Sequence, residues 1–442
     1  MKEPISPDTE ERITKALLVG IRDEKMSQDE AASLARELAG LVDTLGLEII
    51  SRETVHVREN HAKYGMGTGK AEELAQKAAS LEADCIIFDR DISPSQQRNW
   101  EELSGISVID RQELIIQIFA SRARTREAEL QINLAELNYA LPRLQHKYID
   151  LSRQHGGRYG TRGSGETRLE TDRRQVEQRI HRLEEELEDV RRQRQVQRKQ
   201  RERQSVPVCA LVGYTNAGKS SILNALTGAE VLAEDKLFAT LDPTSRRLEL
   251  PQGMQVILVD TVGFIRRLPH SLINAFRSTL EEASRADILI NVLDASERDI
   301  AKHYETTLAI LRELNAENIP MITVLNKIDR VESAGGLSTE FLPADRGLDG
   351  TALEALLRLY PDSIPVSAAD GRGLADLCAR LESVLSGGSL RFHFPPERTD
   401  LAALLHRSGT VIREKYGEGF IEMEARVDER TAGRLKEYQV NE

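Results

Sequence analysis

The first 110 residues alternate between short apolar runs and longer segments with helical periodicity. Apolar or alternating runs at 14–22, 47–58 and 84–90 predict β-strands. Between them, 27–46 and 70–83 repeat apolar residues every three or four positions and predict amphipathic helices, the first of which stops at Gly46. Strands that alternate with helices favour a parallel sheet with crossover helices. We therefore expect a small parallel-sheet α/β domain at 1–110.

Residues 111–204 have a different period, with apolar residues four and three positions apart. The repeat consists of Leu130, Leu134, Leu137, Leu141, Leu144 and Tyr148, and then of Leu169, Val176, Ile180, Leu183, Leu187 and Val190. Only Arg173 breaks the frame of the second set. Two such stripes joined by one loop predict a long antiparallel coiled-coil hairpin. Pro142 lies inside the first stripe and predicts a local kink.

The remainder of the chain divides into two further parts. Residues 205–388 begin with the apolar strand SVPVCALVG and continue as alternating strands and helices. Residues 389–442 contain LRFHF, DLAALLHRS, VIREKY, FIEMEARV and ERTAGRLKEY, which predict a strand–helix–strand–strand–helix α+β domain. Residues 416–419 (YGEG) predict its hairpin turn. The expected fold class is therefore multidomain α/β.

Composition restricts the class and the compartment of the protein. The chain has 442 residues, 40% of them apolar and 30% charged, which is typical of a folded protein of several domains. Cys85, Cys209 and Cys378 have neither disulfide nor zinc spacing, which favours a reducing cytosol. The N-terminus lacks the apolar segment of a signal peptide, and no stretch is apolar enough for an integral membrane segment. We expect a cytoplasmic protein.

The charge is unevenly distributed along the chain. The net charge of −12 argues against coating of nucleic acid by bulk charge, and we expect no DNA partner. However, residues 151–204 contain 15 basic and 10 acidic side chains, a local +5, which leaves −17 for the remainder. The run at 191–204, with seven basic residues and one acid, is read as a solvated helix face or linker. The loop at 149–167 is rich in glycine and arginine and offers nothing that forms a core.

The candidate chemistry begins with a phosphate-binding loop. Gly213, Tyr214, Thr215, Asn216, Ala217, Gly218, Lys219 and Ser220 match G-x-x-x-x-G-K-S. An apolar strand precedes the loop and a helix containing Ser221 follows it, which is the context that this motif requires. The two glycines let backbone N–H groups face the phosphates of a nucleotide. Lys219 would reach the β- and γ-phosphates, and the Ser220 hydroxyl would bind Mg²⁺.

Three further motifs follow in chain order after apolar strands. Asp260 and Gly263 in LVDTVG could hold the Mg²⁺ shell and contact the γ-phosphate. Asn326, Lys327 and Asp329 form NKID, in which the Asp329 carboxylate can accept two hydrogen bonds from guanine, a pair that adenine cannot donate. Ser367 and Ala368 offer backbone contacts to the guanine oxygen. Each motif alone could be a strand-end turn, but the ordered series predicts GTP and GDP as ligands.

This series resembles the Ras-like GTPase superfamily, which implies catalytic roles for Lys219, Gly263 and a switch threonine. Thr240 in LFATLDPT is the expected threonine and Thr244 the alternative; its hydroxyl would complete the Mg²⁺ coordination of Ser220 and Asp260 when GTP is bound. Phe264 stands where relatives carry a water-orienting glutamine, so hydrolysis is slow or another residue, a cation or a partner supplies the missing group. Asn216 stands where several potassium-activated bacterial GTPases carry a cation-binding asparagine, so the resemblance makes K⁺ a candidate cofactor.

The more specific resemblance is to the HflX family of bacterial and organellar GTPases. It rests on DKLFATLDPTSRRLELP, DTVGFIRRLPHSLINAFRSTLEE, HAKYGMGTGKAEEL and the tip GGRYGTRGSGETRLETDRR, and covers nearly the whole chain. The resemblance implies a GTPase that binds the large ribosomal subunit and helps to dissociate or rescue ribosomes. We expect a monomer. The resemblance also implies rRNA contact by the hairpin tip, where Arg153, Arg158, Arg162 and Arg168 could bind phosphates and stack on bases.

Several alternatives stay open at this point. The chain could be a nucleotide-gated RNA-binding scaffold or assembly factor with incidental hydrolysis, whereas NKID argues against a small-molecule kinase. The tip could be a loop without a partner. Residues 65–70 (GMGTGK) fit a turn or an rRNA contact better than a second nucleotide site, because the full loop spacing is missing. His56, His61 and His303 lack ligand spacing and are interpreted as surface or packing residues.

Overall fold

A computed structural model describes residues 14–154, 164–202, 206–229, 236–269, 272, 282–333, 352–385, 389–417, 419–427 and 429–440. The internal contacts divide the chain into two compact units. The first comprises Met1–Asp189 with Pro269–Ala275, and the second comprises Val190–Leu268 with Phe276–Glu442. The finer division into four parts stays a prediction. None of the described helices is long and apolar enough to cross a membrane.

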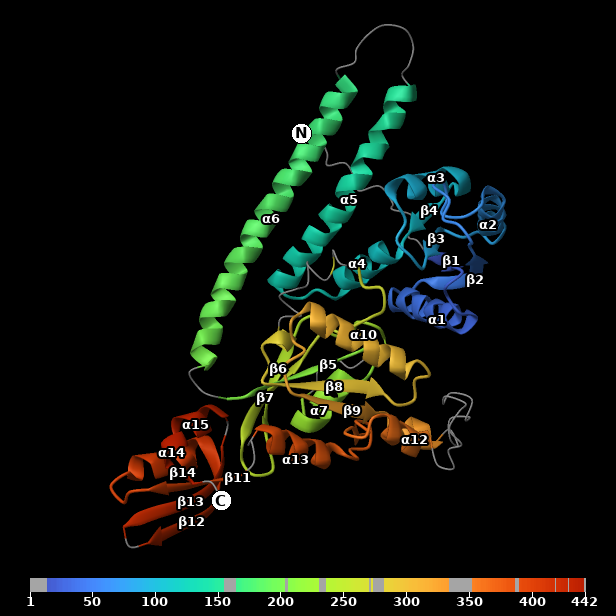
Figure 1. Cartoon of the computed structure of the whole chain (residues 1–442). Helices are drawn as coiled ribbons and strands as arrows, with labels where there is room; N and C mark the ends of the chain where they lie inside the picture. Colours follow the sequence, from blue (N-terminus) through green and yellow to red (C-terminus); the bar gives the residue numbers. More distant parts are fainter. Residues whose placement is uncertain are drawn as a thin grey trace. The chain divides into compact units, whose positions relative to one another are not determined.

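The first unit contains a four-stranded parallel sheet, as predicted (Figure 1). Its strands, in spatial order, are β2 (Glu48–His56), β1 (Lys15–Arg22), β3 (Cys85–Phe88) and β4 (Ser107–Ile109). The crossover helices are α1 (Gln28–Thr44), α2 (Thr68–Ser80) and α3 (Pro94–Ser104). Helix α3 and strand β4 were not predicted, because α3 buries only Trp100 and β4 has three residues.

The ends of these helices follow local sequence signals. The Ser27 hydroxyl accepts a hydrogen bond from the Glu30 N–H and caps α1. Gly46 adopts φ +74° just after this helix, where a residue with a Cβ atom would be strained. The residue before α2 is Gly67, and Gly65 has φ +75°, so the glycine-rich segment makes the turn that starts α2.

Three helices follow the sheet, which confirms the predicted helical region. They are α4 (Arg111–Arg122), α5 (Arg126–Gln154) and α6 (Ser164–Glu202). Arg126 at the start of α5 lies 2.6 Å from the Glu186 carboxylate in the later part of α6, so the two long helices run antiparallel. Helix α5 continues through Pro142. The side chains of Arg153, Arg158, Arg162 and Arg168 lie outside the described set.

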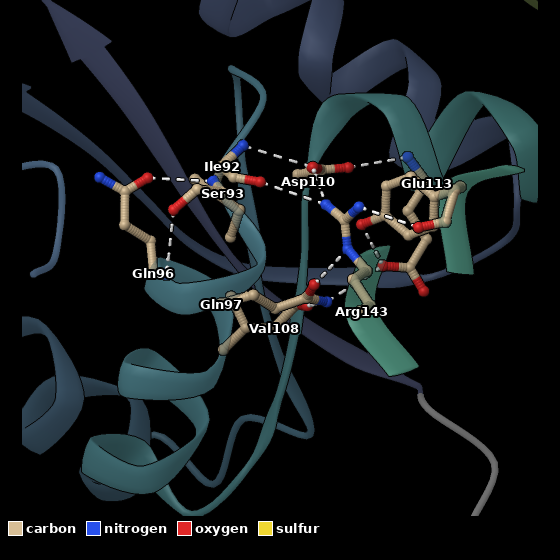
Figure 2. A network of polar contacts seen from close by, with 9 residues as sticks. Ile92, Ser93, Gln96, Gln97, Val108, Asp110, Glu113 and Arg143 are labelled. Atoms are coloured by element: carbon tan, nitrogen blue, oxygen red, sulfur yellow. Dashed lines mark hydrogen bonds and ion pairs between the residues drawn. The ribbon is translucent and has the colours of Figure 1, made fainter. Parts of the chain in front are cut away.

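A buried polar network joins α5 to the end of the sheet (Figure 2). The Arg143 guanidinium donates to the Gln97 side chain at 2.7 Å, to the Ile92 carbonyl at 3.1 Å and to Asp110 at 3.1 Å. The Tyr139 hydroxyl donates to Glu113 at 3.0 Å. We call these five residues and the Ile92 carbonyl the Arg143 network. It fixes the root of the hairpin on the N-terminal sheet.

The second unit contains a six-stranded sheet and a separate four-stranded sheet. The larger has the order β10 (Ile364–Pro365), β9 (Met321–Asn326), β8 (Ile288–Asp294), β5 (Val208–Gly213), β7 (Gln255–Asp260) and β6 (Thr244–Glu249). All neighbours are parallel except the β6–β7 pair. Its described helices are α7 (Lys219–Thr227), α10 (Ile300–Glu313), α11 (Ile328–Ser333), α12 (Ala352–Leu359) and α13 (Leu374–Leu385).

The smaller sheet is antiparallel, with the order β12 (Gly409–Gly417), β13 (Phe420–Val427), β11 (Ser389–Phe394) and β14 (Gln439–Val440). Helices α14 (Thr399–Ser408) and α15 (Glu429–Arg434) accompany it. The predicted order of elements is confirmed, and Gly419 takes φ +90° in the expected hairpin turn. The two-residue strand β14 was not predicted.

Candidate nucleotide-binding site

The predicted motif residues meet at one edge of the six-stranded sheet. Strands β5, β7 and β9 end at Gly213, Asp260 and Asn326, and they run parallel within the same sheet. The carboxyl ends of parallel strands are where ligands bind in such sheets. The pocket at this edge is lined by Thr215, Asn216, Gly218, Lys219, Ser220, Ser221, Lys236, Phe238, Ala239, Thr240, Thr261, Gly263, Lys327 and Arg330.

The curvature of the phosphate-binding loop requires glycine at its two ends. Gly213 has φ +137°, and a Cβ atom there would lie 2.3 Å from the Val292 carbonyl oxygen. Gly218 has φ +93°, and a Cβ atom there would lie 2.2 Å from the amide nitrogen of Asn326. The loop then leads directly into α7, which starts at Lys219. The positive end of this helix faces the pocket and suits an anion.

Lys219 is held inside the loop rather than extended into solvent. Its ammonium group donates to the Gly213 carbonyl at 3.2 Å and to the Tyr214 carbonyl at 2.8 Å. Burial lowers the pKa of Lys219 to about 8, although the nearby Asp260 carboxylate opposes this shift. A bound phosphate would favour the charged ammonium form, because a nearby negative charge raises the pKa of a lysine.

Three oxygen-bearing side chains from separate segments form a triangle. The Ser220 hydroxyl donates to Asp260 Oδ2 at 2.6 Å, the Thr240 hydroxyl donates to the same oxygen at 2.9 Å, and the two hydroxyls lie 2.8 Å apart. Burial raises the pKa of Asp260, and its other oxygen, Oδ1, has no hydrogen-bond partner. Hard oxygen donors with an unsatisfied carboxylate oxygen fit the preference of Mg²⁺.

Of the two candidate switch threonines, Thr240 lies in this triangle. Thr244 instead begins β6, where its backbone pairs with Asp260 across the antiparallel ladder. Among the described residues, no group of three or more His, Cys, Asp or Glu side chains is arranged to hold a metal ion. The triangle is a different kind of group, because the Ser220 and Thr240 hydroxyls supply two of its three oxygens.

The segment after Asp260 is tied to the phosphate-binding loop. A Cβ atom on Gly263 would lie 2.7 Å from Thr215 Cα and 2.9 Å from the Lys219 ammonium, so only glycine fits. The Phe264 N–H donates to the Gly213 carbonyl at 3.0 Å, and the Thr215 N–H donates to the Phe264 carbonyl at 2.8 Å. The Phe264 side chain is 1% exposed. It is packed into the core and cannot orient a water molecule.

Tyr214 adds a contact that the sequence did not indicate. Its hydroxyl accepts a hydrogen bond from the Arg266 backbone N–H at 2.8 Å. Its ring stacks on His303 of α10, with ring centroids 3.6 Å apart. His303 is therefore a packing residue, which is one of the two roles expected for it. Tyr214 therefore connects the phosphate-binding loop to α10 and to the segment that follows Gly263.

The guanine motifs are braced against the same loop. The Asn326 amide donates to the Ala217 carbonyl at 2.9 Å and accepts from the Ala368 N–H at 3.2 Å. The Lys327 ammonium donates to the Asn216 carbonyl at 2.7 Å. The Ser367 hydroxyl donates to Asp329 at 2.7 Å. The residues that were predicted from the sequence to bind guanine thus lie next to the phosphate-binding loop.

Five pocket residues were not predicted from the sequence, namely Lys236, Phe238, Ala239, Thr261 and Arg330. Arg330 directly follows Asp329, so its position next to the NKID motif was an available signal. Phe238 and Ala239 lie in the same LFATLDPT segment as Thr240, and Lys236 directly precedes this segment, so the position of Thr240 was a second available signal.

Family models match most of the chain in three consecutive regions. They are described as GTP-binding GTPase N-terminal at residues 32–120, GTP-binding GTPase Middle Region at 122–201 and 50S ribosome-binding GTPase at 208–327. The GTPase HflX of Akkermansia muciniphila is 46% identical over 92% of this chain and 93% of its own length. That of Escherichia coli is 39% identical over 91% of each chain.

A solved GTP-binding protein from Sulfolobus solfataricus, in complex with GDP, is 25% identical over 84% of this chain and 98% of that chain, with a TM-score of 0.43. The six-stranded sheet, the phosphate-binding loop and the guanine motifs define a P-loop GTPase, an enzyme that binds GTP and hydrolyses it to GDP. The extent and identity of the match to its relatives place the chain more narrowly. It belongs to the HflX family of GTPases.

Proposed function

We propose that this GTPase is a nucleotide-driven switch that binds the large ribosomal subunit and promotes the dissociation or rescue of ribosomes. The observation that carries this proposal is the match of residues 208–327 to a family described as 50S ribosome-binding GTPases. The separate positive charge of residues 151–204 supports it, because rRNA offers phosphates to arginine side chains. Ribosome binding in turn implies a cytoplasmic protein, and we expect a monomer.

The nucleotide site supplies the switch. Ser220, Thr240 and Asp260 would hold Mg²⁺, which would neutralise phosphate charge, and Thr240 would sense whether the γ-phosphate is present. Lys219, Thr240 and the Gly263 N–H stabilise charge on the γ-phosphoryl group during hydrolysis. Asp329 selects guanine, with the Ser367 and Ala368 backbone beside the guanine oxygen.

A potassium ion beside Asn216 is a further part of this proposal. Asn216 is exposed at the mouth of the pocket and has φ +62°. A cation there would stabilise the charge that develops between the β- and γ-phosphates. Equal rates of GTP turnover in sodium and in potassium would show that no potassium ion takes part in hydrolysis.

The proposal is tested by GTP turnover with and without large ribosomal subunits, together with a subunit-dissociation assay. Strong stimulation and subunit release are expected. A scaffold with incidental hydrolysis would bind the subunit without either effect.

The role of the hairpin tip is tested separately with two charge-matched variants. Arg158→Gln combined with Arg162→Gln should weaken co-sedimentation with large subunits and leave basal hydrolysis unchanged. Arg179→Gln combined with Arg182→Gln removes the same charge from exposed positions of α6 and should retain binding. Equal losses in the two variants would show that only bulk charge matters. Removal of 156–165 should reproduce the first result.

A further inference from the structure

The buried position of Phe264 leaves open which polar group meets the reacting end of GTP. Thr215 in the phosphate-binding loop is a candidate, because it lines the pocket and is only 5% exposed. Its hydroxyl oxygen has no hydrogen-bond partner. A buried hydroxyl without a partner costs free energy, so such a group in a pocket indicates an atom of a ligand that will pair with it.

Thr215 lies next to the position expected for the γ-phosphate. The Cβ position of Gly263 falls 2.8 Å from the Thr215 methyl carbon and 2.9 Å from the Lys219 ammonium. Thr215, Gly263 and Lys219 therefore meet around one point. Gly263 and Lys219 are two of the groups proposed to stabilise the γ-phosphoryl group, so the Thr215 side chain lies beside the position proposed for it.

The position of Thr215 is fixed by its surroundings. Its N–H donates to the Phe264 carbonyl at 2.8 Å, and the preceding residue, Tyr214, is held by Arg266 and His303. Threonine has few χ1 rotamers, because two heavy atoms branch from Cβ. On this fixed backbone the hydroxyl has few orientations to choose from, so it loses little entropy when it orients a second molecule.

The other threonine hydroxyls of the pocket are already engaged. The Thr261 hydroxyl donates to the Leu211 carbonyl at 2.6 Å, and the Thr240 hydroxyl donates to Asp260 at 2.9 Å. The cationic side chains of Lys236 and Arg330 are exposed at the rim. Thr215 thus combines burial, an unpaired oxygen and proximity to the γ-phosphate contacts.

We propose that Thr215 is a catalytic residue whose hydroxyl orients the attacking water and takes the role that Phe264 cannot fill. A hydroxyl can accept a hydrogen bond from water while it donates one to a γ-phosphate oxygen. The water oxygen forms the new bond to the γ-phosphorus, and the bond from that phosphorus to the β–γ bridging oxygen breaks. GDP leaves with the electron pair, and the proton lost by water passes to the released phosphate. The inference rests on the proposed placement of the γ-phosphate and is independent of the ribosome.

The test uses Thr215→Val, which keeps the shape and removes the hydroxyl, and Thr215→Ser, which keeps the hydroxyl. Thr227→Val is the matched control, because this hydroxyl bonds only within α7. Single-turnover hydrolysis of GTP with the protein in saturating excess, the Kd for a fluorescent GDP and the thermal unfolding midpoint are measured for each full-length protein.

Thr215→Val should lower the single-turnover rate about 10²-fold with a GDP affinity within about twofold of wild type. Thr215→Ser should recover most of the rate, and Thr227→Val should match wild type. The inference is overturned by a Thr215→Val rate within about twofold of wild type, or by a rate loss that Ser does not recover. If Thr215→Val does not fold, Thr215→Ala replaces it with the same expected and contrary results. Absence of GDP binding in the wild type would refute the proposed site instead.

Discussion

Two of the polar clusters among the described residues each contain a buried aspartate, and they differ in how completely their hydrogen-bonding atoms are satisfied. The nucleotide site holds Asp260 and the Arg143 network holds Asp110, and burial raises the pKa of each carboxyl. In the Arg143 network, none of the buried side-chain atoms of its described residues lacks a partner. At the nucleotide site, Asp260 Oδ1 and the Thr215 hydroxyl have none.

This difference distinguishes a cluster that only holds elements together from a site that binds a ligand. The Arg143 network is of the first kind, and we call it the anchor. In the network, Asp110 accepts from Arg143, from the Ile92 N–H and from the Glu113 N–H, so its charge is compensated by the protein itself (Figure 2). At Asp260 the protein supplies donors to one oxygen only and leaves the other for a ligand. Unsatisfied buried atoms in and beside the pocket therefore distinguish the nucleotide site from the Arg143 network.

The largest expected effect concerns base selection at the nucleotide site. In Asp329→Asn, an amide replaces the carboxylate that is proposed to accept from guanine N1–H and from its 2-amino group. GDP affinity should fall about 10²-fold or more, because a buried donor then opposes a donor. Xanthosine diphosphate, with an oxygen at position 2, should bind better than GDP.

Titration with fluorescent GDP and with fluorescent xanthosine diphosphate measures the change in base preference. Asp362→Asn is the control, because Asp362 is exposed and does not line the pocket. An unaltered preference for GDP in Asp329→Asn would place the base elsewhere.

The next largest effect is expected from a substitution that disrupts the Arg143 network and leaves the nucleotide site unchanged. Arg143→Met leaves Asp110 and Glu113 buried without their cation, which should cost about 3 kcal/mol of unfolding free energy near neutral pH. Basal GTP hydrolysis should be unchanged. Urea unfolding measures the loss, with Arg179→Met as the exposed control.

The pH dependence of this loss has a definite sign. Burial raises the pKa of Asp110 and of Glu113, while Arg143 opposes the shift in each. A carboxyl with a raised pKa contributes stability below its unfolded value, and this contribution is lost as pH rises through the folded value. Removal of Arg143 raises these pKa values further, so the deficit of Arg143→Met should grow from pH 5 to pH 8. A deficit that shrank over this range would contradict the network.

The smallest effect concerns a third kind of position, an unsatisfied group that does not line the pocket. Asn291 lies in β8, is 0% exposed, and neither its amide nitrogen nor its oxygen has a partner. Asn291→Leu should raise the unfolding free energy by about 1 kcal/mol, because an unpaired amide is costly to bury. Asn291→Asp should lower it strongly. Thermal unfolding distinguishes the two, and destabilisation by Leu would mean that the amide is satisfied.

The sequence predicted the clusters unequally, for a physical reason. The Ser220, Asp260 and Asn326 segments each follow a parallel strand, so spacing along the chain already implied that they meet. The Arg143 network joins residues of α3, α4 and α5 through side-chain contacts, and no periodicity indicates which arginine faces which carboxylate. The same limit applies to Tyr214, whose contact with Arg266 depends on the path of the loop after Gly263.

Secondary structure was likewise predicted where the sequence has a periodic pattern and not where an element depends on tertiary contacts. Heptad spacing predicted the long helices, and apolar runs predicted the buried strands β1, β3 and β5. Helix α3 was missed because its single buried residue, Trp100, gives no periodic signal. Its position depends on a tertiary contact, the hydrogen bond from the Trp100 indole to the Tyr64 carbonyl at 3.0 Å.

The most direct test of the distinction between site and anchor is a paired measurement on Asp260→Asn and Asp110→Asn. GTP turnover and the free energy of unfolding are determined for both full-length variants. We expect Asp260→Asn to lose about 10²-fold in turnover while its unfolding free energy is retained or increased. We expect Asp110→Asn to retain turnover and lose stability. Retained turnover in Asp260→Asn, or lost turnover in a folded Asp110→Asn, would contradict the account.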